Sequence, residues 1–194
     1  GALFAQGHLP VPVLALNQPE SGATPPPGSL AFGLAPDVEG AQAAEHMVGL
    51  GIKEAVVFAA TEDWAERASL AFRAQFESLG GKVVGEARLR DGEVNFAAAI
   101  RQAVGNFATA GEAGLFLSLR PQQARLLLPQ LKLASVTLPA FATSHVYGGS
   151  SNPGLDRDLD GLEFCDAPWL FDAAPGLPSR EELARSLETA RGPG

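Results

Sequence analysis

The feature that most limits the fold of this chain is a regular alternation of strand-like and helix-like segments between residues 30 and 146. The strand segments are unbroken apolar runs, such as residues 54–60 (EAVVFAA) and 114–119 (GLFLSL). Such runs are typical of parallel strands that are buried on both faces of a sheet. Consecutive parallel strands need a helical crossover, which is right-handed almost without exception. The alternation therefore predicts an α/β lobe with three layers and a doubly wound parallel sheet.

Residues with strong positional preferences mark the helix ends of this lobe. The expected N-caps or first residues of its four helices are Pro36, Thr61, Asn95 and Pro121. Gly51 and Gly80 are expected to stop the first two helices. Pro129 lies inside the fourth helix. Because proline has no backbone N–H to donate, we expect Pro129 to kink or end that helix.

Further strand-like segments flank the lobe. Residues 10–16 (PVPVLAL) have the pattern of an edge strand, and a second apolar stretch runs from residue 162 to residue 171. We expect these two segments to pack on one partial sheet with an exposed edge that invites pairing between chains. Near the end of the chain, Ser179 and Glu182 predict a helix that begins with a capping box.

These patterns define the expected domain organisation. Residues 30–146 are expected to form the complete lobe, and the chain is expected to be a piece of a larger protein. The partial second lobe, with crossing strands, would comprise residues 1–17 and 160–194, and the connectors would be residues 18–29 and 147–159.

Charge and composition exclude several classes of partner. The chain has 14 Lys and Arg against 22 Asp and Glu, a net charge of -8, and the basic residues are scattered. Nucleic acids and anionic lipid surfaces are bound through cationic density, so we expect neither as a partner. No apolar run approaches the roughly 18 residues of a membrane span. With Cys165 as the single cysteine, no internal disulfide can form.

Catalytic motifs are also missing from the sequence. Ser144 and His145 are adjacent, but neighbouring side chains of a strand point to opposite faces, so they are not expected to act as nucleophile and base. No G-x-S-x-G motif and no glycine-rich phosphate loop occurs. We therefore expect neither serine-hydrolase chemistry nor a cofactor.

One acidic segment resembles half of a calcium loop. Asp156, Asp158 and Asp160 alternate ahead of Gly161, but Ala167 stands where a calcium loop needs a bidentate glutamate. We interpret the segment as a solvated acidic turn and expect no metal site.

Trp64 and Arg67 lie one turn apart at the start of a helix that follows a strand. Open α/β sheets bind ligands at this position, beyond the carboxyl ends of their strands. An ion pair between Arg67 and Asp63, four residues earlier, is the alternative interpretation of the arginine.

Several segments, taken in order, resemble the LppC family of bacterial lipoproteins between about residues 9 and 171. The segments are residues 11–17 (VPVLALN), 32–34 (FGL), 64–67 (WAER) ahead of Gly80 and Gly81, Pro129, residues 142–144 (ATS) with Tyr147, and residues 158–161 (DLDG) ahead of 166–169 (DAPW). The combination is much more specific than any one segment.

The resemblance implies a fold like that of type I periplasmic solute-binding proteins, in which crossing strands join two α/β lobes. It also implies a non-enzymatic protein that activates a bifunctional class A penicillin-binding protein, and thereby peptidoglycan synthesis, from the inner leaflet of the outer membrane. No lipobox cysteine and no helical-repeat domain precede the lobes in this sequence. The lipid anchor, and with it any membrane contact, is therefore expected in the parent protein.

In proteins of this fold, a cleft between the lobes is lined by the carboxyl ends of strands and by the hinge. The corresponding candidate cleft residues are Asn17, Thr61, Trp64, Arg67, Thr143, Ser144 and Tyr147. The alternative function is a periplasmic solute-binding module that closes on an amino acid or a muropeptide. Thr143 and Ser144 would then bind a carboxylate, and Trp64 or Tyr147 would cover the apolar part.

Overall fold

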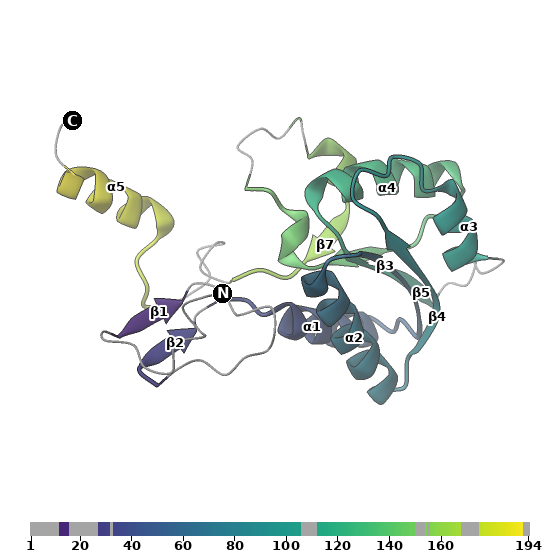
Figure 1. Cartoon of the computed structure of the whole chain (residues 1–194), viewed down its shortest axis with the longest axis horizontal. Coiled ribbons are helices and arrows are strands. Elements are labelled where there is room, and N and C mark those ends of the chain that lie inside the picture. The colour runs from purple at the N-terminus through teal and green to yellow at the C-terminus, as the bar shows by residue number, and fades with distance from the viewer. Residues whose placement is uncertain are drawn as a thin grey trace.

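The computed structural model describes residues 12–15, 27–31, 33–105, 112–149, 154, 156–167 and 175–191. Its largest unit is a five-stranded parallel sheet with the strand order β4-β3-β5-β6-β7 (Figure 1). The strands are β3 (Glu54–Ala60), β4 (Lys82–Leu89), β5 (Ala113–Ser118), β6 (Ala140–Ala142) and β7 (Leu162–Phe164). The predicted parallel α/β sheet is thereby confirmed.

Helices cover both faces of this sheet. On one face lie α1 (Pro36–Gly49) and α2 (Asp63–Ser78), and on the other lie α3 (Ala97–Val104) and α4 (Pro121–Leu133) (Figure 1). The central strands β3 and β5 are buried along nearly their whole length, which explains their unbroken apolar sequence. Phe72 of α2 stacks on Phe116 of β5, with ring centroids 4.1 Å apart. This contact ties the helix layer to the middle of the sheet.

Two glycines allow unusually close contact between elements. A Cβ added at Gly40 of α1 would lie 2.1 Å from the carbonyl oxygen of Ala68 in α2. At Gly85 of β4, an added Cβ would lie 1.7 Å from the carbonyl oxygen of Ala103 in α3. Any larger residue at these positions would force backbones apart, so both glycines are needed for packing.

Three expectations about helix ends are wrong. Phe96, not Asn95, is the N-cap residue of α3, although the Asn95 side chain accepts the Ala97 N–H at 3.1 Å. Glu62, not Thr61, is the N-cap residue of α2, because the helical turn starts one residue later than the pattern indicates. The expected end of α4 at Pro129 is also wrong, because the helix continues to Leu133, whereas a kink at the proline stays a prediction. Buried leucines on both sides of the proline, Leu128 and Leu131, hold the helix against the core and offset the missing hydrogen bond.

The expected capping box is present at α5 (Arg180–Arg191). The Ser179 N–H donates to a Glu182 carboxylate oxygen at 2.8 Å, and the Glu182 N–H donates to the Ser179 hydroxyl at 3.2 Å. In Figure 1, α5 lies apart from the five-stranded sheet.

The flanking strands differ from the expectation. A separate two-stranded parallel sheet is formed by β1 (Val13–Ala15) and β2 (Ser29–Ala31), whereas β7 pairs with β6 in the large sheet. The prediction that residues 11–16 and 162–171 share a sheet is therefore wrong. At the start of the expected lobe, β2 pairs with β1 and does not join the large sheet. Leu162 and Phe164 pack against the core of the lobe, which draws β7 to its sheet. The second-lobe assignment of the remaining residues stays a prediction.

None of the helices in the described part of the chain combines the length and apolar character needed to cross a bilayer.

Candidate functional site

The candidate residues gather where parallel strands end. The turns after β3, β5 and β6 meet the first turn of α1 at the carboxyl edge of the sheet, where contacts join Glu39 to Ser144 and Arg120 to Trp64. Asn17 lies outside the described residues. The other candidates are described below by the contacts they make.

Ser144 is bound by a buried carboxylate that no local sequence pattern links to it. The backbone N–H of Ser144 donates to one oxygen of Glu39 at 2.5 Å, and its hydroxyl donates to the other at 3.0 Å. Glu39 lies in the first turn of α1 and is 0% exposed. Burial raises the pKa of its carboxyl group, the two hydrogen bonds from Ser144 counteract part of that rise, and nearby Asp166 adds to it. Glu39 therefore joins α1 to the end of β6.

His145 contacts the face of Trp64. The two rings are stacked, with centroids 4.1 Å apart and planes 8° from parallel. The guanidinium of Arg120 lies 5.3 Å from the Trp64 ring centroid and donates from Nε to Glu62 at 3.1 Å. Burial lowers the pKa of His145, and the charge of Arg120 lowers it further. The imidazole is thus held as a neutral ring in an aromatic stack.

Ser144 and His145 lie in a short 3-10 helix, η1 (Ser144–Val146), not in a strand as expected. The strand β6 ends at Ala142. The two side chains point to different partners, Glu39 and Trp64, so the hydroxyl is not bonded to the imidazole. The two side chains are separated as predicted, but for a different reason. A helical turn directs them apart, not the alternation of a strand.

Arg67 is held by Asp37, not by Asp63 as the alternative interpretation assumed. The guanidinium of Arg67 donates from Nε to Asp37 at 3.1 Å and from Nη2 to the second carboxylate oxygen. The hydrogen bond to Asp37 raises the pKa of Arg67, and nearby Asp63 adds a smaller electrostatic effect. This bidentate pair fixes the start of α2 against the start of α1.

Thr61, Thr143 and Tyr147 differ widely in accessibility. Thr61 is exposed, whereas Thr143 is 0% exposed and its hydroxyl has no hydrogen-bond partner among the described residues. Tyr147 is 45% exposed and packs on Phe164 of β7, with ring centroids 5.9 Å apart. The structure thus brings Trp64, Arg67, Thr143 and Ser144 to one packed edge, while Tyr147 lies toward β7.

The acidic segment forms a second 3-10 helix, η3 (Arg157–Leu159). Asp156 accepts a hydrogen bond from Nη2 of Arg125 at 2.5 Å, so α4 holds the carboxylate that would be first in a calcium loop. Within the described residues, no group of three or more His, Cys, Asp or Glu side chains is arranged to hold a metal ion.

Comparison with solved structures defines the fold. A leucine-binding protein from Thermotoga maritima superimposes with a TM-score of 0.61 and 20% identity, over 85% of this chain and 45% of its own. The C-domain of LpoA from Haemophilus influenzae, described as a regulator of PBP1A, gives a TM-score of 0.65 and 22% identity, over 91% of this chain and 53% of its own. The fold is that of the type I periplasmic-binding proteins.

The family is defined by sequence. A family model described as "LppC putative lipoprotein" matches residues 2–192, so this chain belongs to the LppC family. Among curated relatives, the penicillin-binding protein activator LpoA of Erwinia tasmaniensis is 28% identical over 85% of this chain and 30% of its own length. LpoA of Serratia proteamaculans is also 28% identical, over 85% of this chain and 29% of its own. The chain therefore spans about a third of these relatives, whose names describe activators, not enzymes.

Proposed function

We propose that this chain is part of a non-enzymatic regulator of peptidoglycan synthesis, which binds and activates a class A penicillin-binding protein in the periplasm. The observation that carries the proposal is the alignment of most of the chain with proteins named penicillin-binding protein activator. The likeness to a domain described as a regulator of PBP1A supports the same role. By the same reasoning, the parent protein is anchored to the outer membrane by a lipid and reaches into the periplasm.

The contacts at the carboxyl edge of the sheet favour a protein partner over a small solute. Ser144 is engaged by Glu39, Arg67 by Asp37, and Trp64 by His145. A solute at this edge would have to replace contacts that already satisfy these side chains, which reduces the net gain from binding. A protein partner can instead use surfaces beside this edge, where side chains remain exposed.

An activator must bind the active conformation of its target more tightly than the inactive one, because equal affinity shifts no population. The test uses the full-length parent protein with a purified class A penicillin-binding protein. Glycan polymerisation and peptide cross-linking are measured with the parent, with a parent that lacks residues 30–167, and with neither. We expect the intact parent to raise at least one rate and the truncated parent to raise neither. If the intact parent leaves both rates unchanged, the proposal fails.

A second candidate is a solute-binding module that closes on an amino acid or a muropeptide, a peptidoglycan fragment. The likeness to the leucine-binding protein and the buried hydroxyl of Thr143 favour it. A ligand at a hundred times its dissociation constant stabilises the folded state by about 2.7 kcal/mol. Thermal unfolding is measured with amino acids and muropeptides, and the same panel is applied to a Thr143→Val variant. An unchanged melting temperature across the panel would exclude this candidate.

A further inference from the structure

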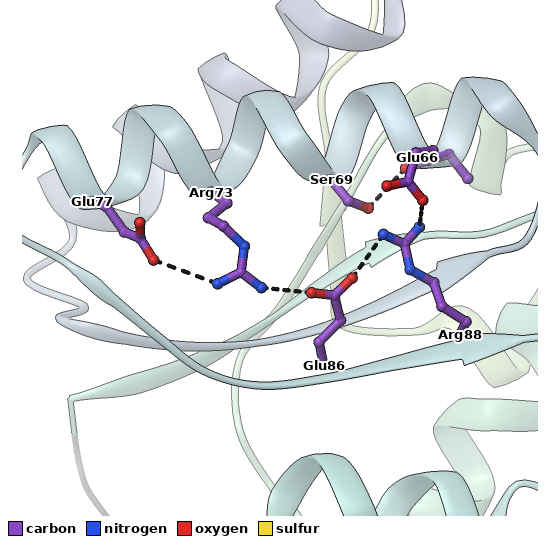
Figure 2. A network of polar contacts seen from close by, with 7 residues as sticks. Glu66, Ser69, Arg73, Glu77, Glu86 and Arg88 are labelled. Atoms are coloured by element: carbon purple, nitrogen blue, oxygen red, sulfur yellow. Dashed lines mark hydrogen bonds and ion pairs between the residues drawn. The ribbon is translucent and has the colours of Figure 1, made fainter.

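The two edges of the five-stranded sheet are protected differently. At one edge, β4 carries a chain of ion pairs with α2 (Figure 2). Glu86 bridges Arg73 at 2.5 Å and Arg88 at 2.8 Å, and these arginines pair with Glu77 at 3.5 Å and Glu66 at 2.6 Å. Charged side chains of this kind discourage a further strand from pairing with a sheet edge. The β4 edge is therefore an unfavourable docking surface.

The other edge is formed by β7, and no strand of the described residues pairs with its outer side. Successive residues of a strand point to opposite faces, so Leu162 and Phe164 share one face and Glu163 shares the other with Cys165. One pocket reaches Glu163 and Cys165, the other reaches Leu162, and Phe164 borders both. The β7 edge thus combines backbone groups that no described strand pairs with and a pocket on either side of the strand.

The first pocket lies between β7 and α1 and has a volume of about 310 Å³. Its walls include Phe141, Ala142, His46, Glu163 and Cys165. The carboxylate of Glu163 already lies 3.0 Å from the imidazole of His46. Burial raises the pKa of the Cys165 thiol, and nearby Glu39 adds to that rise, so the thiol is held in its uncharged form. This pocket suits an apolar side chain.

The second pocket lies between β7 and η3 and also has a volume of about 310 Å³. Tyr147, Leu159, Leu162 and Phe164 form apolar walls, and Asp160 lies at its border. No cation of the described residues forms an ion pair with Asp160. Aromatic and leucine walls fit the alkyl stem of a long basic side chain, and the carboxylate fits its charge. This pocket suits lysine or arginine.

We propose that the β7 edge binds an extended segment of a partner protein in which basic and apolar side chains alternate. The segment adds a strand to the sheet, so that backbone hydrogen bonds supply affinity and the alternating pockets supply specificity. This binding site goes beyond the proposed function, because it does not depend on which partner protein carries the segment.

Charge decides between a basic partner and a second copy of this chain. Asp158, Asp160 and Glu163 are exposed beside the edge, and the whole chain carries a net charge of -8. Two β7 edges in contact would place these carboxylates opposite one another, and like charges across a strand pair are destabilising. A basic segment meets opposite charge instead.

The probe is the blocked peptide acetyl-Thr-Lys-Val-Lys-Val-Thr-amide, titrated into the isotopically labelled chain and followed by amide NMR shifts. We expect the shifts to concentrate at Leu162, Glu163 and Phe164. We expect Asp160→Lys to weaken binding at least tenfold. The control Asp91→Lys removes an exposed carboxylate in the turn after β4, on the opposite side of the sheet, and should leave binding within twofold.

Two further peptides separate strand pairing from simple charge attraction. A version with alternate N-methylated amides keeps the charges but lacks the donors for pairing, and an acidic version replaces both lysines with glutamates. Neither should bind. Equal affinity for the N-methylated peptide, equal effects of the two aspartate substitutions, or no shifts at β7 would each overturn the proposal. So would light scattering that shows a dimer of this chain in which the amides of Leu162, Glu163 and Phe164 are protected from exchange.

Discussion

Replacement of Glu39 tests whether one buried carboxylate joins α1 to the end of β6. The Glu39→Ala variant removes both acceptors of Ser144 and leaves its backbone N–H without its partner. An unsatisfied partly buried donor costs about 1–3 kcal/mol, and the lost methylene adds about 0.8 kcal/mol. Relief from burying a charge offsets part of this cost. We expect a net loss of about 2 kcal/mol, which corresponds to about 4–8 °C in melting temperature for a domain of this size.

The Glu39→Gln variant separates hydrogen bonding from charge. Its amide oxygen can still accept the Ser144 N–H, but the group no longer titrates. Because burial raises the pKa of Glu39, the folded wild-type chain binds the proton more tightly than the unfolded chain. The associated stability is fully present below the ordinary carboxyl pKa of about 4.3 and is lost as the pH rises through the raised value. At neutral pH, we therefore expect Glu39→Gln to be at least as stable as wild type.

The assay is urea unfolding followed by circular dichroism between about pH 4 and pH 8, where carboxyl groups with ordinary and raised pKa values titrate. Glu45→Gln, a change at an exposed glutamate of the same helix, is the matched control and should keep the wild-type pH profile. The reasoning is refuted if Glu39→Gln destabilises as much as Glu39→Ala at neutral pH. It is also refuted if Glu39→Gln keeps the wild-type pH profile.

Three further substitutions test the packing, the aromatic stack and the ion pairs. Gly40→Ala should lower the free energy of unfolding by about 3 kcal/mol, because the added Cβ overlaps backbone atoms. The control Gly49→Ala has open space around its added Cβ and should be neutral or slightly stabilising in the same urea titration. Equal effects of the two substitutions would contradict the packing argument. Because the pKa of His145 is lowered, its contribution is present above the ordinary histidine pKa of about 6.5 and is lost as the pH falls. His145→Gln should therefore make the urea midpoint of unfolding depend less on pH between about pH 5 and pH 7. An unchanged pH dependence would count against a buried neutral ring. Glu86→Gln should cost about 1 kcal/mol at low salt and less at high salt, and a salt-independent cost would show that its charge is not the cause.

Local sequence patterns were sufficient to predict much of the lobe. The strands β3 and β5 could be predicted because their burial on both faces requires unbroken apolar runs, and the capping box of α5 because its two partners are three residues apart. The error at Pro129 shows where local reasoning stops. A helix can retain a proline when its flanking leucines are buried, and their burial depends on the tertiary packing.

The candidate site could be located from sequence only to the edge of a sheet. Strand ends and the resemblance to the LppC family drew attention to Trp64, Arg67 and Ser144, but the partners of these residues were missed. An acidic residue in the first turn of α1 was a visible signal for Glu39, yet its contact with Ser144 spans 105 positions. No local rule relates residues so far apart.

By itself, the sequence of this chain determined its class of fold, the order of its strands and helices along the chain, and its family. The fold class and the order of elements depend on apolar periodicity and on helix caps within a few residues. The family depends on short segments in a characteristic order. Only the tertiary structure decided that Asp37 and not Asp63 holds Arg67, that β7 extends the sheet beyond β6, and that two pockets flank its edge. The physical reason is that a contact between distant segments depends on how whole layers pack. The local sequence around one residue therefore does not identify its partner.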